Sequence, residues 1–241
     1  MRMRTIKMLA VRGTMKSVEE TYKELDRNLK EASIAHIGGF RPPEDKITSW
    51  FGGRGVGLKH EIIPTYKGKE MFCLLQVKIS ELPFIPQELK NTKFLVVFTN
   101  REEFPFNKPH GEGWEIREYD SLAGLGFLPK SKEPDVVRDF PVMWHKIDDD
   151  APDWENAWEI VDMTPINESD GEDERFFDEY NRYPGTKFGG YPSCIQHGHN
   201  LEGFIFQIGS EEKPNWMWAD NGIAYFNKDK SGTWGFECQF Y

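Results

Sequence analysis

The chain is poor in cysteine, in long apolar runs and in basic residues. It has 241 residues with only three cysteines, and its 40 acidic residues outnumber its 30 basic ones. The cysteines are odd in number and far apart, which predicts reduced thiols rather than a disulfide framework. No run reaches the roughly 18 apolar residues that a membrane-spanning helix requires, and the apolar stretch 8–11 is too short for a secretory signal. We therefore expect a cytoplasmic protein without a membrane segment.

Signatures of cofactors and metals are also missing. The glycine-rich segment 51–57 lacks the spacing of a phosphate-binding loop and is expected to be flexible. Cys194, His197 and His199 carry donor atoms that suit zinc, but no fourth ligand follows in a known spacing. The same residues could pair as nucleophile and base, yet the sequence places no carboxylate to orient them. We therefore expect no metal, no cofactor and no catalytic residue.

Acidic residues are concentrated in one segment. Residues 148–179 carry fourteen Asp or Glu and one basic residue, Arg175, whereas the whole chain has a net charge of −10. Such a segment repels nucleic acid and attracts a basic protein. It also has the composition of a solvated connector. The acidic residues that we expect to contact a partner are Asp148, Asp149, Asp150, Glu172, Asp173 and Glu174.

Two parts of the chain share a pattern. Ile37-Gly38-Gly39-Phe40 returns as Phe188-Gly189-Gly190-Tyr191, and each copy precedes an apolar run that contains a glutamine, Gln76 or Gln207. The pattern predicts an internal duplication within one domain over residues 1–241. We expect a first unit at about 37–100, an acidic connector at about 148–179 and a second unit at about 187–241.

Apolar periodicity predicts a strand-rich α+β fold with helices at the periphery of one globule. Ser17 and Glu20 fit a capping box, at the start of a helix whose apolar face runs from Val18 to Ala32 and packs on a sheet. A strand is expected before it, at 6–11. The further segments expected as strands are 71–79, 93–99, 114–119, 141–147, 204–208, 222–226 and 233–240, and those expected as short helices are 152–161 and 173–180.

Candidate ligand-binding residues are densest at 216–222. Trp216 and Trp218 point the same way if the segment is extended, and Asp220 follows in a tight turn. These side chains could bind a ligand, or the indoles could fill the core while the Asp220 carboxylate holds the turn amides. The candidate ligand-binding residues are Trp216, Trp218, Asp220, Asn221, Gln207, His197 and Tyr191.

The two matching glutamines leave a similar choice. A glutamine buried in a strand must satisfy its amide. Gln76 and Gln207 either face a shared pocket between the two units or each hold the Gly-Gly loop of their own unit. The second role is needed in both units and is the one that we expect.

Residues 187–241 contain four motifs in sequence, KFGGYPSCIQ, GFIFQIGS, WMWADNGIAYF and FECQFY. In this order they resemble the YwqG-like family of bacterial proteins, a domain of unknown function, and the first unit resembles that family more weakly. Ala219 stands where the family has a glycine. The resemblance implies the family's fold and an intracellular setting, and it implies no activity.

Composition and motifs together favour a binding protein over an enzyme. We expect the acidic segment to bind a basic protein, as an immunity protein binds a basic toxin, and we expect neither nucleic acid nor a membrane as a partner. The alternative is an enzyme or small-ligand receptor with a site in the cleft between the two units, near Trp216, Trp218 and Asp220.

Overall fold

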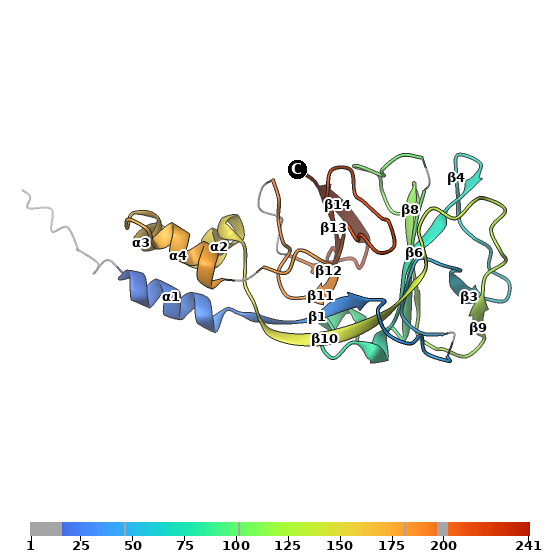
Figure 1. The fold of residues 1–241 in the computed structure, drawn as a ribbon, viewed down its shortest axis with the longest axis horizontal. Helices are drawn as coiled ribbons and strands as arrows, with labels where there is room; N and C mark the ends of the chain where they lie inside the picture. The colour runs from blue at the N-terminus through green and yellow to red at the C-terminus, as the bar shows by residue number, and fades with distance from the viewer. Residues whose placement is uncertain (1–15, 46, 101, 181, 197–201) are drawn as a thin grey trace, which may run out of the picture.

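A computed structural model of the protein describes residues 16–45, 47–100, 102–180, 182–196 and 202–241 (Figure 1). The strand predicted at 6–11 lies outside these residues. Within them, the chain forms a ten-stranded antiparallel sheet, two pairs of short strands and four α-helices. The fold is therefore strand-rich α+β, as the sequence predicts.

The strands of the large sheet are ordered β14-β13-β12-β11-β1-β10-β2-β6-β7-β8. Their bounds are β1 Lys30–Ile37, β2 Trp50–Phe51, β6 Phe72–Lys78, β7 Phe94–Thr99, β8 Trp114–Tyr119, β10 Phe140–Asp150, β11 Lys187–Gly189, β12 Phe204–Gly209, β13 Ile223–Lys228 and β14 Trp234–Gln239. The short pairs are β3 Val56–Leu58 with β9 Leu125–Phe127, and β4 Thr65–Tyr66 with β5 Lys69–Glu70. The 3-10 turns η1 Ile79–Glu81 and η2 Gln87–Leu89 follow β6.

The sheet curls until its edge strands β8 and β14 contact each other through side chains. Trp114 of β8 packs on Phe236 of β14 with ring centroids 5.4 Å apart. The indole N–H of Trp234 donates to the Glu118 carboxylate over 2.9 Å. Buried apolar side chains from both halves of the sheet form the main core inside this curl. Because the core draws on both halves, neither half encloses it alone.

β6 and β7 are continuous apolar runs because both of their faces are covered. Leu75 and Val97 belong to the main core, whereas Cys73 and Val96 belong to a second core that residues of β3 and β9 help to close. Every position of β7 is buried, and so is every position of β6 before its last residue. Strands with two covered faces need apolar side chains at successive positions, and this is why the sequence reveals them.

The four helices gather at one end of the molecule, beyond the ends of the paired strands β1 and β10 (Figure 1). Their bounds are α1 Val18–Arg27, α2 Trp154–Ile160, α3 Thr164–Asn167 and α4 Glu172–Glu179. They enclose a separate apolar core that includes Tyr22, Leu25 and Phe176. We call these helices the helical lobe. The acidic segment is therefore folded, since it supplies the end of β10 and three of these helices.

α1 begins at the predicted capping box but ends earlier than predicted. The Glu20 amide donates to the Ser17 hydroxyl over 3.2 Å, and the Ser17 amide donates to the Glu20 carboxylate over 2.9 Å. Asn28 ends the helix, where its side-chain amide donates to the Glu24 carbonyl over 2.8 Å. Ala32 consequently lies in β1, and α1 packs against the other helices rather than on the sheet.

The remaining predicted elements are present. The structure has strands at 72–78, 94–99, 114–119, 140–150, 204–209, 223–228 and 234–239, and helices at 154–160 and 172–179. Each coincides within a few residues with a predicted segment, because apolar periodicity reports directly on a covered face. In the described part of the chain, no helix is both long enough and apolar enough to cross a membrane.

Candidate functional site

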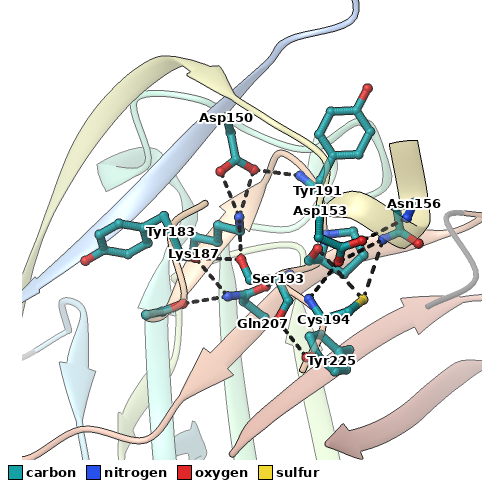
Figure 2. A network of polar contacts seen from close by, with 12 residues as sticks. Asp150, Asp153, Asn156, Tyr183, Lys187, Tyr191, Ser193, Cys194, Gln207 and Tyr225 are labelled. Carbon is teal, nitrogen blue, oxygen red and sulfur yellow. Dashed lines mark hydrogen bonds and ion pairs between the residues drawn. The ribbon is translucent and has the colours of Figure 1, made fainter. Parts of the chain in front are cut away.

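A buried ion pair lies where β10 ends and β11 begins (Figure 2). The Lys187 ammonium donates to the two carboxylate oxygens of Asp150 over 2.9 and 2.8 Å, and both side chains are fully shielded from solvent. Lys187 also donates to the Ser193 hydroxyl over 3.1 Å. Burial lowers the pKa of Lys187, and the Asp150 carboxylate opposes that shift. Removal of either partner would leave a buried charge without its counter-charge.

The acidic segment also binds the backbone of residues 191–194. The amide of Tyr191 donates to the Asp150 carboxylate over 2.7 Å, and the amide of Cys194 donates to the Asp153 carboxylate over 2.9 Å. Gly190 precedes this segment with a φ of +69°, and a Cβ there would overlap the Asp150 carboxylate. Asp150 and Asp153 therefore hold the chain that follows β11 against the end of β10 and the start of α2.

Lys187 and Ser193 form a contact like that of a base and a nucleophile, but their surroundings indicate a structural role. The Ser193 hydroxyl donates to the Tyr183 carbonyl over 2.8 Å, and the residue is only 5% exposed. The Tyr225 hydroxyl donates to the Ser193 carbonyl over 2.8 Å. Because the ammonium is bound to a carboxylate and the hydroxyl is already donating, neither group is available to activate a substrate. We assign this network to stability.

Three of the predicted ligand-binding residues are buried, and they belong to different contacts. Trp218 is 1% exposed and packs on Trp216 in the main core, with ring centroids 4.9 Å apart. Gln207 is buried and accepts the Ser193 amide over 2.9 Å. Tyr191 is buried and its hydroxyl donates to the Asn28 carbonyl over 2.6 Å. The tryptophan pair thus fills the core, as the structural alternative predicts. His197 and His199 lie outside the described residues.

The turn at 219–222 differs from the prediction in what holds it. Within the described residues, the Asp220 side chain makes no hydrogen bond, and the residue is exposed. Ser210 holds the turn instead, because its hydroxyl donates to the Gly222 carbonyl over 2.8 Å and accepts the Trp218 amide over 3.0 Å. Asn221 has a φ of +50°, the left-handed conformation that asparagine tolerates in turns. The prediction that the Asp220 carboxylate binds the turn amides is therefore wrong.

The acidic residues predicted to contact a partner fall into two groups. Asp150 is 1% exposed and bound to Lys187, so it cannot meet a partner, and its inclusion was wrong. Glu172 is half-buried and forms an ion pair with Arg175 over 3.3 Å. The others, Asp148, Asp149, Asp173 and Glu174, are exposed. The sequence count could not separate these groups, because burial of a carboxylate depends on distant partners.

The helical lobe exposes two large aromatic side chains that the sequence analysis missed. Trp158 of α2 is 42% exposed and Phe177 of α4 is 53% exposed. Trp154 links them, with its ring centroid 6.3 Å from Trp158 and 5.6 Å from Phe177. The adjacent pair Phe176-Phe177 indicates in the sequence that one phenylalanine is exposed, because only one of two neighbours can face the core of a one-sided helix. Phe176 takes that inward position.

Carboxylates surround these aromatics. Glu155 lies three residues before Trp158, and Asp173 and Glu174 lie four and three residues before Phe177, so helical spacing places them beside the rings. All three carboxylates are exposed, and none of them forms an ion pair within the described residues. We call Trp158, Phe177, Glu155, Asp173 and Glu174 the acidic–aromatic face.

Arg175 does not neutralise this face. Its guanidinium binds the carboxylates of Glu19, Glu172 and Glu179 over 3.0, 3.3 and 2.9 Å, and it lies 4.1 Å from the centre of the Tyr22 ring. The single basic residue of the acidic segment is therefore engaged between α1 and α4. The carboxylates of the acidic–aromatic face keep their negative potential toward solvent.

Comparison with known proteins gives a family and no activity. The family model of a domain of unknown function, DUF1963, matches residues 49–231, which is well over half of the chain. No curated protein matches the chain. The matched range includes every strand of the large sheet except β1 and β14, and it includes the whole acidic–aromatic face.

Proposed function

The chain belongs to the DUF1963 family, whose description assigns no activity, and we propose that it is a binding protein that holds a basic protein partner on its acidic–aromatic face. The observation that carries the proposal is the exposure of Trp158 and Phe177 on the helical lobe. Both belong to the segment 148–179, which holds fourteen acidic residues and one basic residue. A basic toxin neutralised by an immunity protein is one partner of this kind.

The two components of the face have separate roles in this proposal. Exposed tryptophan and phenylalanine side chains are the type of residue that anchors an interface, where removal of one anchor costs about 2 kcal/mol or more. Carboxylates around them steer a basic partner toward the face and set the salt dependence of association. Because no basic side chain of the described residues forms an ion pair with Glu155, Asp173 or Glu174, these carboxylates face solvent and can take this role.

Affinity capture from a lysate of the host cell tests the proposal. The wild-type protein, Trp158→Ser/Phe177→Ser and Ile62→Ser/Met217→Ser serve as baits, the last as a control because Ile62 and Met217 are exposed apolar residues outside the helical lobe. We expect a basic protein that the wild type and the control retain and that the aromatic variant loses. The retained protein is then purified, and binding is reconstituted. Identical capture by all three baits would contradict the proposal.

The alternative function, a small-ligand receptor near Trp216 and Trp218, is favoured by one observation. Both indole N–H groups are buried without a hydrogen-bond partner in the described part of the chain. A ligand acceptor could satisfy them, since a buried donor left unpaired costs about 1–3 kcal/mol. Trp216→Phe keeps an aromatic ring and removes one N–H. A ligand that co-purifies with the wild type and is lost from this variant, with thermal stability otherwise retained, would support the alternative.

We also infer that the sheet arose by duplication and that the chain is YwqG-like. The order of the strands supports the duplication, because β11 to β14 and the series β2, β6, β7, β8 run outward from β1 and β10 in opposite directions. The register supports it as well, since Gln207 pairs with Lys187 where Gln76 pairs with Trp50. This register makes residues 51–53 the counterpart of residues 188–190. The sequence pattern instead matches 188–191 to 37–40. A best superposition of the two series that pairs other strands would contradict the duplication.

The four motifs in 187–241 support the YwqG-like assignment.

A further inference from the structure

A pocket of about 390 Å³ opens beside β2 in the first half of the sheet. The residues that line it include the aromatic residues Trp50 and Phe127 together with Arg54 and Gln76. The acidic residues Glu44, Asp45 and Asp139 also line it. It is separate from both the helical lobe and the tryptophan pair, and a cavity of this size suits a small molecule.

The amide of Gln76 has a fixed orientation and an unpartnered oxygen. Gln76 is 1% exposed, and its Nε2 donates to the Thr48 carbonyl over 3.2 Å. Because Nε2 must face that carbonyl, Oε1 is the atom left over, and it has no hydrogen-bond partner within the described residues. A buried acceptor of this kind requires an N–H or O–H donor.

The equivalent glutamine in the other half of the sheet shows which donor such an oxygen takes. Gln207 holds the same register position against β11 that Gln76 holds against β2. Its Oε1 accepts the backbone N–H of Ser193 over 2.9 Å, and its Nε2 donates to the carbonyls of Tyr183 and Gly185 over 3.1 and 2.9 Å. At Gln76, no described segment supplies the amide N–H that Ser193 supplies at Gln207. A ligand N–H would complete the same contact.

Arg54 adds a second polar group on the rim of the pocket. Its guanidinium carbon lies 5.1 Å from the centre of the Phe127 ring, and one Nη donates to the Leu128 carbonyl over 2.6 Å. Among the described residues, Arg54 forms no ion pair with a carboxylate. The guanidinium has five N–H donors, so it retains donors for an oxygen of a ligand. Trp50 adds a flat apolar surface to the lining.

We propose that this pocket binds a small planar molecule that donates an amide-type N–H to Gln76 Oε1 and presents a carboxylate or carbonyl oxygen to Arg54. The site goes beyond the proposed function, because it does not involve the acidic–aromatic face. The stacking of the ligand on Trp50 supplies apolar contact, while the two polar contacts set the ligand class. A molecule with no N–H leaves the Gln76 oxygen unpaired and binds more weakly.

Two probes that differ only at the amide nitrogen, which carries hydrogens in one and methyl groups in the other, test the site on the full-length protein. The first is 4-carbamoylbenzoate, which has a planar ring, an amide N–H and a carboxylate, and the second is its N,N-dimethyl amide. Binding is measured by NMR titration of the ¹⁵N-labelled protein, in which side-chain amide and indole signals are resolved. We expect a Kd of about 1 mM for the first probe, the order that a ligand of this size reaches, and at least a roughly tenfold higher Kd for the second.

Variants separate the two polar contacts. Gln76→Leu should raise the Kd of 4-carbamoylbenzoate roughly tenfold, whereas Gln87→Leu, which changes an exposed glutamine outside the pocket, should leave it unchanged. Arg54→Met should weaken 4-carbamoylbenzoate and leave benzamide unaffected, and it serves as the second test because Arg54 is exposed and its loss spares the core. Equal binding of both probes, unchanged binding to Gln76→Leu, or no binding at concentrations about ten times the expected Kd would overturn the proposal.

Discussion

Replacement of the two register-equivalent glutamines by leucine should have very different effects on stability. Gln207→Leu removes three hydrogen bonds, to the Ser193 amide and to the carbonyls of Tyr183 and Gly185. The Tyr183 carbonyl retains the Ser193 hydroxyl as a donor, so the buried Ser193 amide and the carbonyl of half-buried Gly185 lose this partner. At about 1–3 kcal/mol for each unsatisfied group, the variant should lose about 2–6 kcal/mol of unfolding free energy.

Gln76→Leu changes less. It removes one hydrogen bond, to the Thr48 carbonyl, and it also removes the unpartnered Oε1. The loss of one bond and the removal of an unsatisfied acceptor offset each other, so the net change should be about 0–1 kcal/mol. The two substitutions have the same chemistry, and each glutamine is paired with a neighbouring antiparallel strand, so each variant is the control for the other.

Urea unfolding followed by circular dichroism measures both variants. The expected difference of about 3 kcal/mol corresponds to roughly 6–12 °C in Tm for a chain of this size. The slope of unfolding free energy against urea should be the same for both variants, which shows that the unfolded states are comparable. Equal destabilisation by the two substitutions would refute the assignment of a satisfied and an unsatisfied amide, and with it the structural basis of the pocket site.

Three further predictions concern buried or strained groups. Asp150→Ala should lose about 3–5 kcal/mol in urea unfolding, because Lys187 remains buried without its partner, and the addition of Lys187→Met should restore most of this loss. Burial raises the pKa of Cys73 from 9.0 to about 12, so the native thiol stays protonated where the unfolded one ionises. The free energy of unfolding therefore falls as the pH rises from about 9 to 12, by up to about 1.4 kcal/mol per pH unit. The difference in unfolding free energy between wild type and Cys73→Ala should be constant below pH 9 and shrink above it. Ala219→Gly should raise stability by about 0.5–1 kcal/mol, because alanine at a φ of +46° is strained and glycine is not, whereas Ala224→Gly in β13 should lower it.

The elements that sequence reasoning located correctly are those whose signal is local. β6, β7 and β12 are apolar runs because they are covered, and Ser17 with Glu20 starts α1 because the capping box lies within four residues. The end of α1 was misplaced because Ala32 continues a helical spacing while it also fits a strand. Asn28, which caps the helix, was the local signal for the correct boundary.

The candidate site was harder to predict because its contacts join distant parts of the chain. Asp150 counts as one more charge in an acidic run until β10 and β11 bring Lys187 to it, 37 positions away. Likewise, Gln76 and Gln207 have matching surroundings in sequence, and only the hydrogen bonds of the folded chain show that Gln207 Oε1 has a partner while Gln76 Oε1 has none among the described residues. The exposure of Phe177 also depends on how α4 packs, although the adjacent Phe176 indicates that one of the two rings must be exposed.

The salt dependence of the association rate with the partner captured by the wild type tests the central claim most directly. Between 50 and 300 mM salt the Debye length shortens, so that exposed charges attract a partner over a smaller distance. The wild-type association rate should therefore fall roughly tenfold over this range. Glu155→Lys/Asp173→Lys/Glu174→Lys should associate slowly with little salt dependence, and Trp158→Ser/Phe177→Ser should associate normally and dissociate roughly 30-fold faster. Glu88→Lys/Glu112→Lys, which reverses exposed charges outside the helical lobe, is the control and should match the wild type. An association rate that is the same at all salt concentrations and in all variants would contradict the assignment of the acidic–aromatic face as the binding surface.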